Sequence, residues 1–283
     1  MSLLLKGKPV ADSIKEKLKT DVRSLNEKGI FPTIAIVRVG EKDSDMSYER
    51  SIFKSCEEVG VATKSVVLPE KAGQEALEKA IIQLNEDENV HGILPFMPLP
   101  EGYDDDAVKK LLRTEKDIDG MTPGSSASMF SGTGEGFAPC TAEAVIEILN
   151  YYNIPISGKH ACVIGRSMVI GKPVAMLLTA NDATVTVCHS KTVDLPGIVK
   201  KCDIVIAAIG KAKAIEISHF SPSQVIIDVG IHVLENGLMC GDVNFEDAEN
   251  YVAAITPVPG GVGSVTTALL IRHVVFAAEK ILK

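Results

Sequence analysis

The sequence of 283 residues contains no tryptophan, and aromatic residues make up only 5% of it. Basic residues are also in the minority: 29 lysines and arginines stand against 37 aspartates and glutamates, which gives a formal net charge of −8. A protein that binds nucleic acid through charge needs a concentrated basic face. The composition therefore disfavours nucleic-acid binding and favours small-molecule partners.

The chain also lacks an unbroken apolar run of membrane-spanning length, because Arg272 and His273 interrupt the last apolar segment. Near the N-terminus, Lys6 and Lys8 are not followed by an apolar stretch with a small-residue cleavage site, so we expect no secretory signal. These absences predict a cytoplasmic protein with no membrane partner. Hydrophobic residues at 46% and charged residues at 23% indicate a folded, globular chain.

The cysteines are scattered and form no Cys-x-x-Cys pair. They are Cys56, Cys140, Cys162, Cys188, Cys202 and Cys240. This spacing indicates neither a zinc site nor a disulfide framework, so we predict no metal. Free cysteine is often buried, and we expect these thiols to be reduced and to pack in the core.

The first half of the chain alternates amphipathic segments with short apolar runs. The pattern predicts helices at 9–28, 44–59, 74–85 and 105–112, and strands at 33–39, 61–68 and 92–97. Strands that alternate with helices imply parallel pairing through crossover helices. A stretch rich in Gly and Ser, from 122 to 139, breaks the alternation and is predicted to be a loop at a domain boundary.

A second alternating unit follows this loop. It has predicted helices at 141–152, 169–179 and 195–201, and predicted strands at 161–164, 184–188, 204–208 and 225–229. A final apolar helix, at about 264–282, is long enough to pack back on the first domain. The predicted fold class is therefore α/β, with two domains, of which the second is a Rossmann-like, doubly wound parallel sheet.

Residues 161–173 combine a buried strand, a turn that opens with Gly165, and the start of a helix. A cofactor pyrophosphate binds at such a corner, because backbone N–H groups at the helix start attract it and glycines allow close approach. We take Gly165, Arg166, Ser167 and Gly171 as cofactor-binding. Their spacing is not the common G-x-G-x-x-G, so an ordinary strand-turn-helix corner remains an alternative.

The next strand ends in His189-Ser190-Lys191-Thr192, with no acidic residue at its tip. NAD enzymes usually place an Asp or Glu about 20 residues after the glycines, where it binds the ribose 2′-hydroxyl. His189, Ser190 and Lys191, with Arg166, suit a 2′-phosphate instead, so NADP is the favoured cofactor. Simple surface solvation of these side chains is the alternative.

Two later loops complete the predicted site. Val225–Gly230 is a buried strand that ends in a turn, and we take the next residue, Ile231, as cofactor-binding. Residues 255–263 form a Pro/Gly-rich loop that leads into the final helix. Such loops can place backbone groups against a nicotinamide or a substrate, although tight turns without chemistry have the same composition.

Several segments, in this order, resemble the methylenetetrahydrofolate dehydrogenase/cyclohydrolase family along essentially the whole chain. They are Cys56-Glu57-Glu58-Val59-Gly60, Gly92-Ile93-Leu94 with Pro98-Leu99-Pro100, Lys116-Asp117-Ile118-Asp119-Gly120, Pro139-Cys140-Thr141, Gly165-Arg166-Ser167 with Gly171-Lys172-Pro173, His189-Ser190-Lys191-Thr192, and Thr256-Pro257-Val258-Pro259-Gly260-Gly261-Val262-Gly263. The order of so many segments makes the resemblance specific.

The resemblance implies an N-terminal folate domain (1–138, completed by helix 264–283), joined by long helices to an NADP-binding domain (139–263), usually in a homodimer. It also implies two reactions. A dehydrogenase transfers a hydride from the methylene bridge of 5,10-methylenetetrahydrofolate to NADP. A cyclohydrolase adds water to the resulting methenyl cation and gives 10-formyltetrahydrofolate.

By the same resemblance, Tyr48 and Asp119 are the catalytic residues: Tyr48 lies along the folate ring and Asp119 hydrogen-bonds the pterin. Gly263 and Thr266 line the substrate site. Tyr48 could alternatively be a core residue of its helix, and Asp119 could merely shape or cap its turn.

The sequence departs from the family pattern at the substrate site. The family's catalytic lysine, one helical turn after the tyrosine, is Ile52 here, and its glutamine partner is Phe96; both are taken as substrate-binding. Lys54 lies six residues after Tyr48, about 240° around the helix, and is a poor substitute. Asp45 and Ser264 stand where a serine and a proline are usual.

Hydride transfer depends mainly on alignment of the reactants, whereas hydrolysis needs a positioned water and a group that manages protons. The sequence therefore favours an NADP-dependent dehydrogenase with little or no cyclohydrolase activity. One alternative is the ordinary bifunctional enzyme, in which another group replaces the lysine. The other is a non-catalytic protein that senses NADP or folate.

Overall fold

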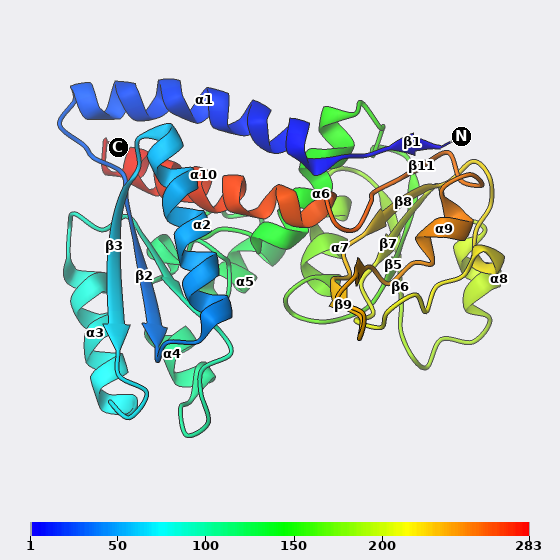
Figure 1. Cartoon of the computed structure of the whole chain (residues 1–283). Coiled ribbons are helices and arrows are strands. Elements are labelled where there is room, and N and C mark those ends of the chain that lie inside the picture. The colour runs from blue at the N-terminus through cyan, green and yellow to red at the C-terminus, as the bar shows by residue number, and fades with distance from the viewer. Residues whose placement is uncertain (1, 283) are drawn as a thin grey trace. The chain divides into compact units, whose positions relative to one another are not determined.

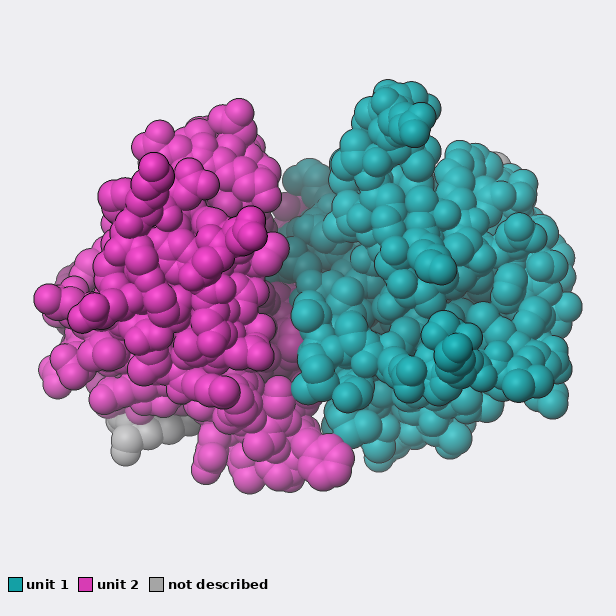
Figure 2. Space-filling view, turned by 90° about the horizontal axis from the view of Figure 1, so that it is seen from below, with its two compact units in different colours: residues 1–11, 141–266 teal, residues 12–140, 267–283 magenta. Residues whose placement is uncertain are grey.

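The structure is a computed structural model that describes residues 2–282. The chain folds into two compact units, which Figure 2 shows in different colours. Unit 1 comprises Met1–Ala11 and Thr141–Thr266, and unit 2 comprises Asp12–Cys140 and Thr267–Lys283. The chain therefore enters unit 2 along helix α1 (Gly7–Glu27), leaves it along α6 (Cys140–Tyr151), and returns along α10 (Thr266–Glu279).

The first residues of the chain belong to unit 1, whereas the domain boundaries expected from the sequence place them in the first domain. The reason is a short parallel pairing between β1 (Leu3–Leu4) and β11 (Ala254–Ile255). The N–H groups of Leu3 and Leu5 donate to the carbonyls of Ala253 and Ile255, each at 2.9 Å. Two-residue strands leave no periodic signal, so this long-range pairing was absent from the predictions.

Unit 2 contains a three-stranded parallel sheet in the order β3-β2-β4. Figure 1 shows β3 and β2 side by side. Its strands are β2 (Thr33–Val39), β3 (Ala62–Leu68) and β4 (Gly92–Pro95). Its helices, besides parts of α1 and α10, are α2 (Asp43–Val59), α3 (Gln74–Glu86), α4 (Asp105–Leu111) and α5 (Pro123–Ser131), with a 3₁₀ turn at Thr114–Lys116. These elements match the predicted pattern to within a few residues, except for α5.

Helix α5 corrects the prediction of an irregular loop from 122 to 139. The Thr122 hydroxyl accepts a hydrogen bond from the Ser125 N–H, and Pro123 occupies the first helical turn, so the helix has a regular start. Gly132, with a φ of 73°, ends it in the left-handed conformation. The serine-rich composition obscured these two end signals.

Unit 1 contains a six-stranded, wholly parallel sheet in the order β1-β11-β8-β7-β5-β6. Besides β1 and β11, its strands are β5 (His160–Ile164), β6 (Thr184–Cys188), β7 (Ile204–Ala207) and β8 (Val225–Asp228). A small antiparallel hairpin is formed by β9 (His232–Val233) and β10 (Met239–Cys240). The helices are α7 (Gly171–Ala180), α8 (Leu195–Val199) and α9 (Phe245–Ala248), with 3₁₀ turns at Ile217–His219 and Val262–Ser264.

The strand order of unit 1 places a topological switch point between β5 and β7. From β5 the chain moves to β6 on one side, and later returns to β7 on the other side. Ligands of open parallel sheets bind at the carboxyl ends of the strands at such a point. The predicted doubly wound fold is confirmed. A ligand site of unit 1 is therefore expected at the turns after β5 and β7.

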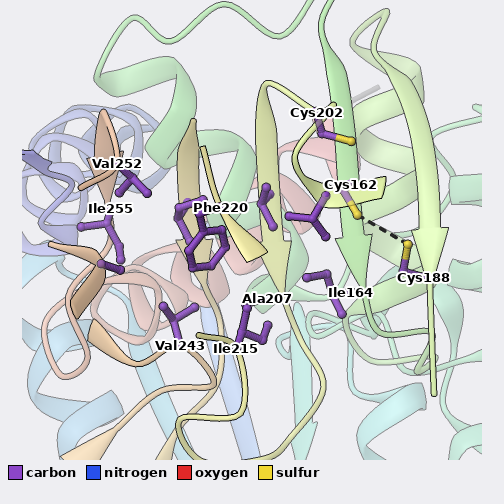
Figure 3. Close-up of a cluster of buried hydrophobic side chains, with 14 residues drawn as sticks. Cys162, Ile164, Cys188, Cys202, Ala207, Ile215, Phe220, Val243, Val252 and Ile255 are labelled. Atoms are coloured by element: carbon purple, nitrogen blue, oxygen red, sulfur yellow. Dashed lines mark hydrogen bonds between the residues drawn. The ribbon is translucent and has the colours of Figure 1, made fainter. Parts of the chain in front are cut away.

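The core of unit 1 contains three of the cysteines. Cys162, Cys188 and Cys202 lie in one cluster of buried side chains with Phe220 (Figure 3), and the sulfur atoms of Cys162 and Cys188 are 3.6 Å apart. All six cysteines of the chain are buried and unbridged. The prediction that they pack as free thiols is confirmed.

Helix α10 is shorter than the predicted 264–282, because 3₁₀ turns replace both of its ends. Most of its side chains are buried. In the described part of the chain, we find no helix with both the length and the apolar character that crossing a membrane requires.

Candidate functional site

In unit 2, the rings of Tyr48 and Phe96 form an apolar wall. Tyr48 and Ile52 are one turn apart on α2, and Phe96 directly follows β4. The rings of Tyr48 and Phe96 have centroids 5.3 Å apart and an interplanar angle of 31°. Ile52 is fully buried and Phe96 is 8% exposed, whereas Tyr48 is 43% exposed and so remains open to a ligand.

Asp119 supplies a carboxylate beside this wall. Its Oδ1 accepts a hydrogen bond of 3.2 Å from the N–H of Cys140, the first residue of α6. Burial raises the pKa of Asp119, and the Cys140 donors act in the opposite direction. Burial, with the nearby Asp119 charge, also raises the pKa of Tyr48 well above its usual range, so the two residues are electrostatic neighbours and the phenol stays protonated.

The tight turn around Asp119 is shaped by another residue. The fully buried Asp117 carboxylate accepts hydrogen bonds from the N–H groups of Met121 (3.0 Å) and Thr122 (2.8 Å) and from the Ser125 hydroxyl (2.6 Å). Asp119 accepts instead from the N–H of Cys140. Of the two carboxylates, Asp119 is therefore the better candidate for a ligand.

Lys54 does not share the face of α2 that carries Tyr48 and Ile52, because it follows Tyr48 by six residues. Its side chain is exposed, and its charge is felt by Glu58, whose pKa is lowered mainly by a hydrogen bond from Lys15 and more weakly by Lys54. Glu58 and Lys15 face each other across α2 and α1, with a separation of 2.7 Å. The structure thus agrees with the helical-wheel argument that Lys54 cannot take the place of a lysine at position 52.

Two cavities of unit 2 lie at opposite edges of its sheet. One, of about 560 Å³, is lined by Phe96, Pro98, Leu99 and Asp45 at the carboxyl ends of the strands. The other, of about 850 Å³, lies at the amino ends, near Thr33 and His91. Ligands of parallel α/β sheets bind at the carboxyl edge, so the smaller of these two cavities is the candidate site in unit 2.

In unit 1, the turn after β5 is built for close backbone approach. Gly165 has a φ of 140°, and a Cβ there would collide with the carbonyl of Ala208, the residue after β7. A Cβ on Gly171 would collide in turn with the backbone of Gly165. The Ser167 hydroxyl accepts from the N–H of Ile170 at 3.2 Å, which caps the start of α7. Two predicted glycines are thus required by the switch-point geometry.

The turn after β6 presents polar side chains to solvent. The His189 N–H donates to the Thr192 hydroxyl at 2.8 Å, and the Lys191 N–H donates to His189 Nδ1 at 3.2 Å, which closes the turn. Arg166, Ser190 and Lys191 are exposed, and their side chains have no hydrogen-bond partner among the described residues. These groups are available for an anion.

Two buried carboxylates hold the neighbouring loops, and the sequence reasoning missed both. Asp242 accepts from the N–H groups of residues 209–211, at 2.6 to 3.1 Å, and from Nε2 of His232 at 2.8 Å. Asp228 accepts from the N–H groups of residues 230, 242 and 243. Burial raises the pKa of Asp228 to about 6, although these hydrogen bonds oppose the shift. For Asp228, the sequence did carry a signal, because this aspartate ends an otherwise apolar strand.

A cavity of about 250 Å³ adjoins these loops in unit 1. Ile231, which is 56% exposed, lines it together with Gly263 and the loop 257–261. A Cβ on Gly263 would lie 3.2 Å from the Ile231 side chain. The Thr266 hydroxyl donates to the Gly263 carbonyl at 3.2 Å. The structure therefore groups three of the predicted residues, Ile231, Gly263 and Thr266.

Comparison with known proteins covers the chain almost from end to end. Residues 5–119 match the tetrahydrofolate dehydrogenase/cyclohydrolase catalytic domain, and residues 139–282 match the NAD(P)-binding domain of the same family. A Clostridium botulinum protein named "Bifunctional protein FolD" is 49% identical over 280 residues, which cover 99% of each chain.

Solved structures of enzymes named as methylenetetrahydrofolate dehydrogenase/cyclohydrolase also match the chain along its length. The bifunctional FolD enzyme of Campylobacter jejuni is 37% identical, with a TM-score of 0.95, and the match covers 99% of this chain and 100% of that one. The Trypanosoma brucei enzyme, solved with NADP and an inhibitor, is 34% identical, with a TM-score of 0.91, over 100% of this chain and 99% of that one. From these matches and the geometry of both units, the chain belongs to the tetrahydrofolate dehydrogenase/cyclohydrolase family.

Proposed function

We propose that this enzyme oxidises 5,10-methylenetetrahydrofolate with NADP. The observation that carries the proposal is the family match over both units, together with a glycine-built turn at the switch point of the unit 1 sheet. When bound, NADP supplies the hydride acceptor, and the chain's own residues bind and orient the reactants.

The residues of unit 1 fit an NADP phosphate better than an NAD ribose. Gly165 and Gly171 let the turn after β5 run close to Ala208 and to its own backbone, where a Cβ would collide. This turn leads into the N-terminus of α7, whose N–H groups can bind a phosphate. Arg166, Ser190 and Lys191 offer donors for a 2′-phosphate, and His189 lies in the same turn. We place the nicotinamide end near Ile231, beside the small cavity of unit 1.

In unit 2 we assign the folate to the carboxyl edge of the sheet. Tyr48 would stack along the folate ring, and the Asp119 carboxylate would accept hydrogen bonds from the pterin N–H groups. Ile52 and Phe96 would form the apolar floor beside the one-carbon bridge. Gly263 and Thr266 of unit 1 are the remaining proposed substrate residues.

Hydrolysis of the methenyl cation is the second candidate activity, and the comparisons favour it. The curated relatives at 47–50% identity carry the name "Bifunctional protein FolD". This finding supports the bifunctional alternative more than the dehydrogenase-only hypothesis. The side chains of this enzyme still bear on the rate of hydrolysis, because the residue one helical turn after Tyr48 is the fully buried Ile52 and the ring beside Tyr48 is that of Phe96.

We therefore propose that hydrolysis is slow relative to dehydrogenation. A water held against Ile52 and Phe96 would find no proton acceptor or cation on that wall, and general acid–base assistance contributes about 10²- to 10⁴-fold in rate. The test supplies methenyltetrahydrofolate alone and follows its loss. Decay at the buffer rate supports slow hydrolysis, and decay far above it supports the ordinary bifunctional enzyme.

We also propose that the enzyme is a homodimer. The family resemblance supports it, and so do exposed apolar side chains of unit 1, notably Val233 (71% exposed) and Leu238 (63%). Sedimentation equilibrium at micromolar concentration tests this directly: a mass close to twice the 30.2 kDa of one chain is expected.

A further inference from the structure

His273 is a buried histidine of α10 that none of the assigned roles uses. It is 2% exposed, and its ring stacks on Phe137 with centroids 4.5 Å apart and an interplanar angle of 19°. Its Nδ1 lies 2.7 Å from the carbonyl oxygen of Ile118 and 3.7 Å from the sulfur of Cys140. A polar ring inside an otherwise apolar helix face calls for an explanation, because burying such a group is costly unless its hydrogen bonds are made.

These contacts fix the direction of the hydrogen bonds. A carbonyl oxygen only accepts, so Nδ1 of His273 carries a hydrogen and donates it to Ile118. The Cys140 thiol also donates to the Ile118 carbonyl, at 3.4 Å. Two donors from α10 and α6 thus converge on one backbone oxygen.

That backbone oxygen belongs to the residue directly before Asp119, and Cys140 is the residue whose N–H binds Asp119 Oδ1. His273 therefore contacts two groups that hold Asp119. One is the Ile118 carbonyl, in the peptide bond that precedes Asp119, and the other is Cys140, whose N–H donates to the Asp119 carboxylate. The charge of His273, when protonated, also favours the ionised form of Asp119.

We propose that His273 is a positioning residue that fixes the Asp119 carboxylate for folate binding. The inference rests on the proposed function, in which Asp119 accepts hydrogen bonds from the pterin. A carboxylate displaced by even a fraction of an ångström would lose its alignment with those donors, because hydrogen bonds weaken steeply with poor geometry. His273 acts on Asp119 through its contacts with Ile118 and Cys140 and through its charge, and we assign it no contact with the substrate.

The experiment compares two substitutions of His273 in the full-length enzyme. His273→Ala removes the Nδ1 donor, and we expect the KM for 5,10-methylenetetrahydrofolate to rise about tenfold while the KM for NADP stays unchanged. His273→Asn places an amide N–H where Nδ1 was, so it should restore the folate KM to within about threefold of the wild type.

A matched control separates positioning from loss of stability. His91 is a second buried histidine of unit 2, and its Nδ1 accepts the Thr33 N–H at 3.2 Å, away from Asp119. His91→Ala should lower the midpoint of thermal unfolding as His273→Ala does, but leave the folate KM unchanged. An equal rise of the folate KM in both variants would overturn the inference, since stability alone would then explain it.

A double-mutant cycle tests whether His273 acts through Asp119. In an Asp119→Asn background, His273→Ala should cause less than a twofold further change in the folate KM. Full additivity of the two changes would overturn the inference and leave the dehydrogenase assignment standing. An inactive wild-type enzyme would instead refute the proposed function, and with it the role of His273.

Discussion

Replacing Ile52 and Phe96 together tests why hydrolysis should be slow. Ile52→Lys places an amine one helical turn after Tyr48, on the same face of α2. Phe96→Gln places an amide at the position whose ring now contacts Tyr48 at 5.3 Å. The lysine has a four-carbon stem, so its ammonium can extend from a fully buried position toward the more exposed Tyr48.

The structure sets the size of the expected effects. Loss of the Tyr48–Phe96 ring contact costs about 0.5–1.5 kcal/mol, and a lysine without its glutamine partner would add the larger cost of an unpaired buried charge. We therefore expect Ile52→Lys alone to be the less stable variant, and Phe96→Gln to recover part of the loss. Hydrolysis should increase about 10²- to 10⁴-fold in the double variant, which is ~3–5 kcal/mol in activation free energy.

The assay follows the loss of methenyltetrahydrofolate at neutral pH, with the buffer rate subtracted. The matched control is Ile52→Met with Phe96→Gln, because methionine has a similar length and flexibility but no charge. The reasoning is refuted if this control gains as much hydrolysis as the lysine variant, or if the wild type already hydrolyses as fast as either.

Arg166→Ala should raise the KM for NADP by about 10- to 100-fold, because a charged hydrogen bond is worth ~1.5–3 kcal/mol, and should leave the KM for NAD unchanged; initial rates with both cofactors check this. Gly165→Ala should destabilise the enzyme by about 1–3 kcal/mol in denaturant unfolding, because of the φ of 140° and the Ala208 carbonyl, and an unchanged midpoint would contradict the packing argument. The folded state favours the protonated form of Asp228, because folding raises its pKa from 3.8 to about 6. We therefore expect the free energy of unfolding to fall by up to ~3 kcal/mol as the pH rises through this range. Asp228→Asn should lack this fall, as denaturant titrations at several pH values between 3 and 8 will show.

The elements with a strong local pattern could be predicted from the sequence. The short β-branched run Thr33–Val39 matches β2 to the residue, and the apolar face that ends at Gly60 predicts α2. The turn at Gly165 could also be recognised, because glycine before a helix start is a local signal. The structural requirement for glycine at this position is the close approach of Ala208. Because Ala208 is 43 residues further along the chain, this contact is visible only in the fold.

Features that depend on distant partners escaped prediction. The pairing of β1 with β11 joins Leu3 to Ala254, and neither segment is long enough to show a period. Asp242 and His273 are single polar residues in apolar surroundings, and their roles follow from partners that the chain brings together only on folding. The family resemblance predicted a functional position at Asp119, and the structure adds that the neighbouring Asp117 shapes the turn.

The most direct test of the account is a two-wavelength assay of the wild-type enzyme with 5,10-methylenetetrahydrofolate and NADP. NADPH formation reports the dehydrogenase, and methenyltetrahydrofolate absorbance in the same cuvette reports the fate of its product. We expect methenyltetrahydrofolate to accumulate nearly in step with NADPH and then to decay at the buffer rate. NADPH formation without accumulation of the methenyl cation would contradict slow hydrolysis, and no NADPH at all would contradict the dehydrogenase itself.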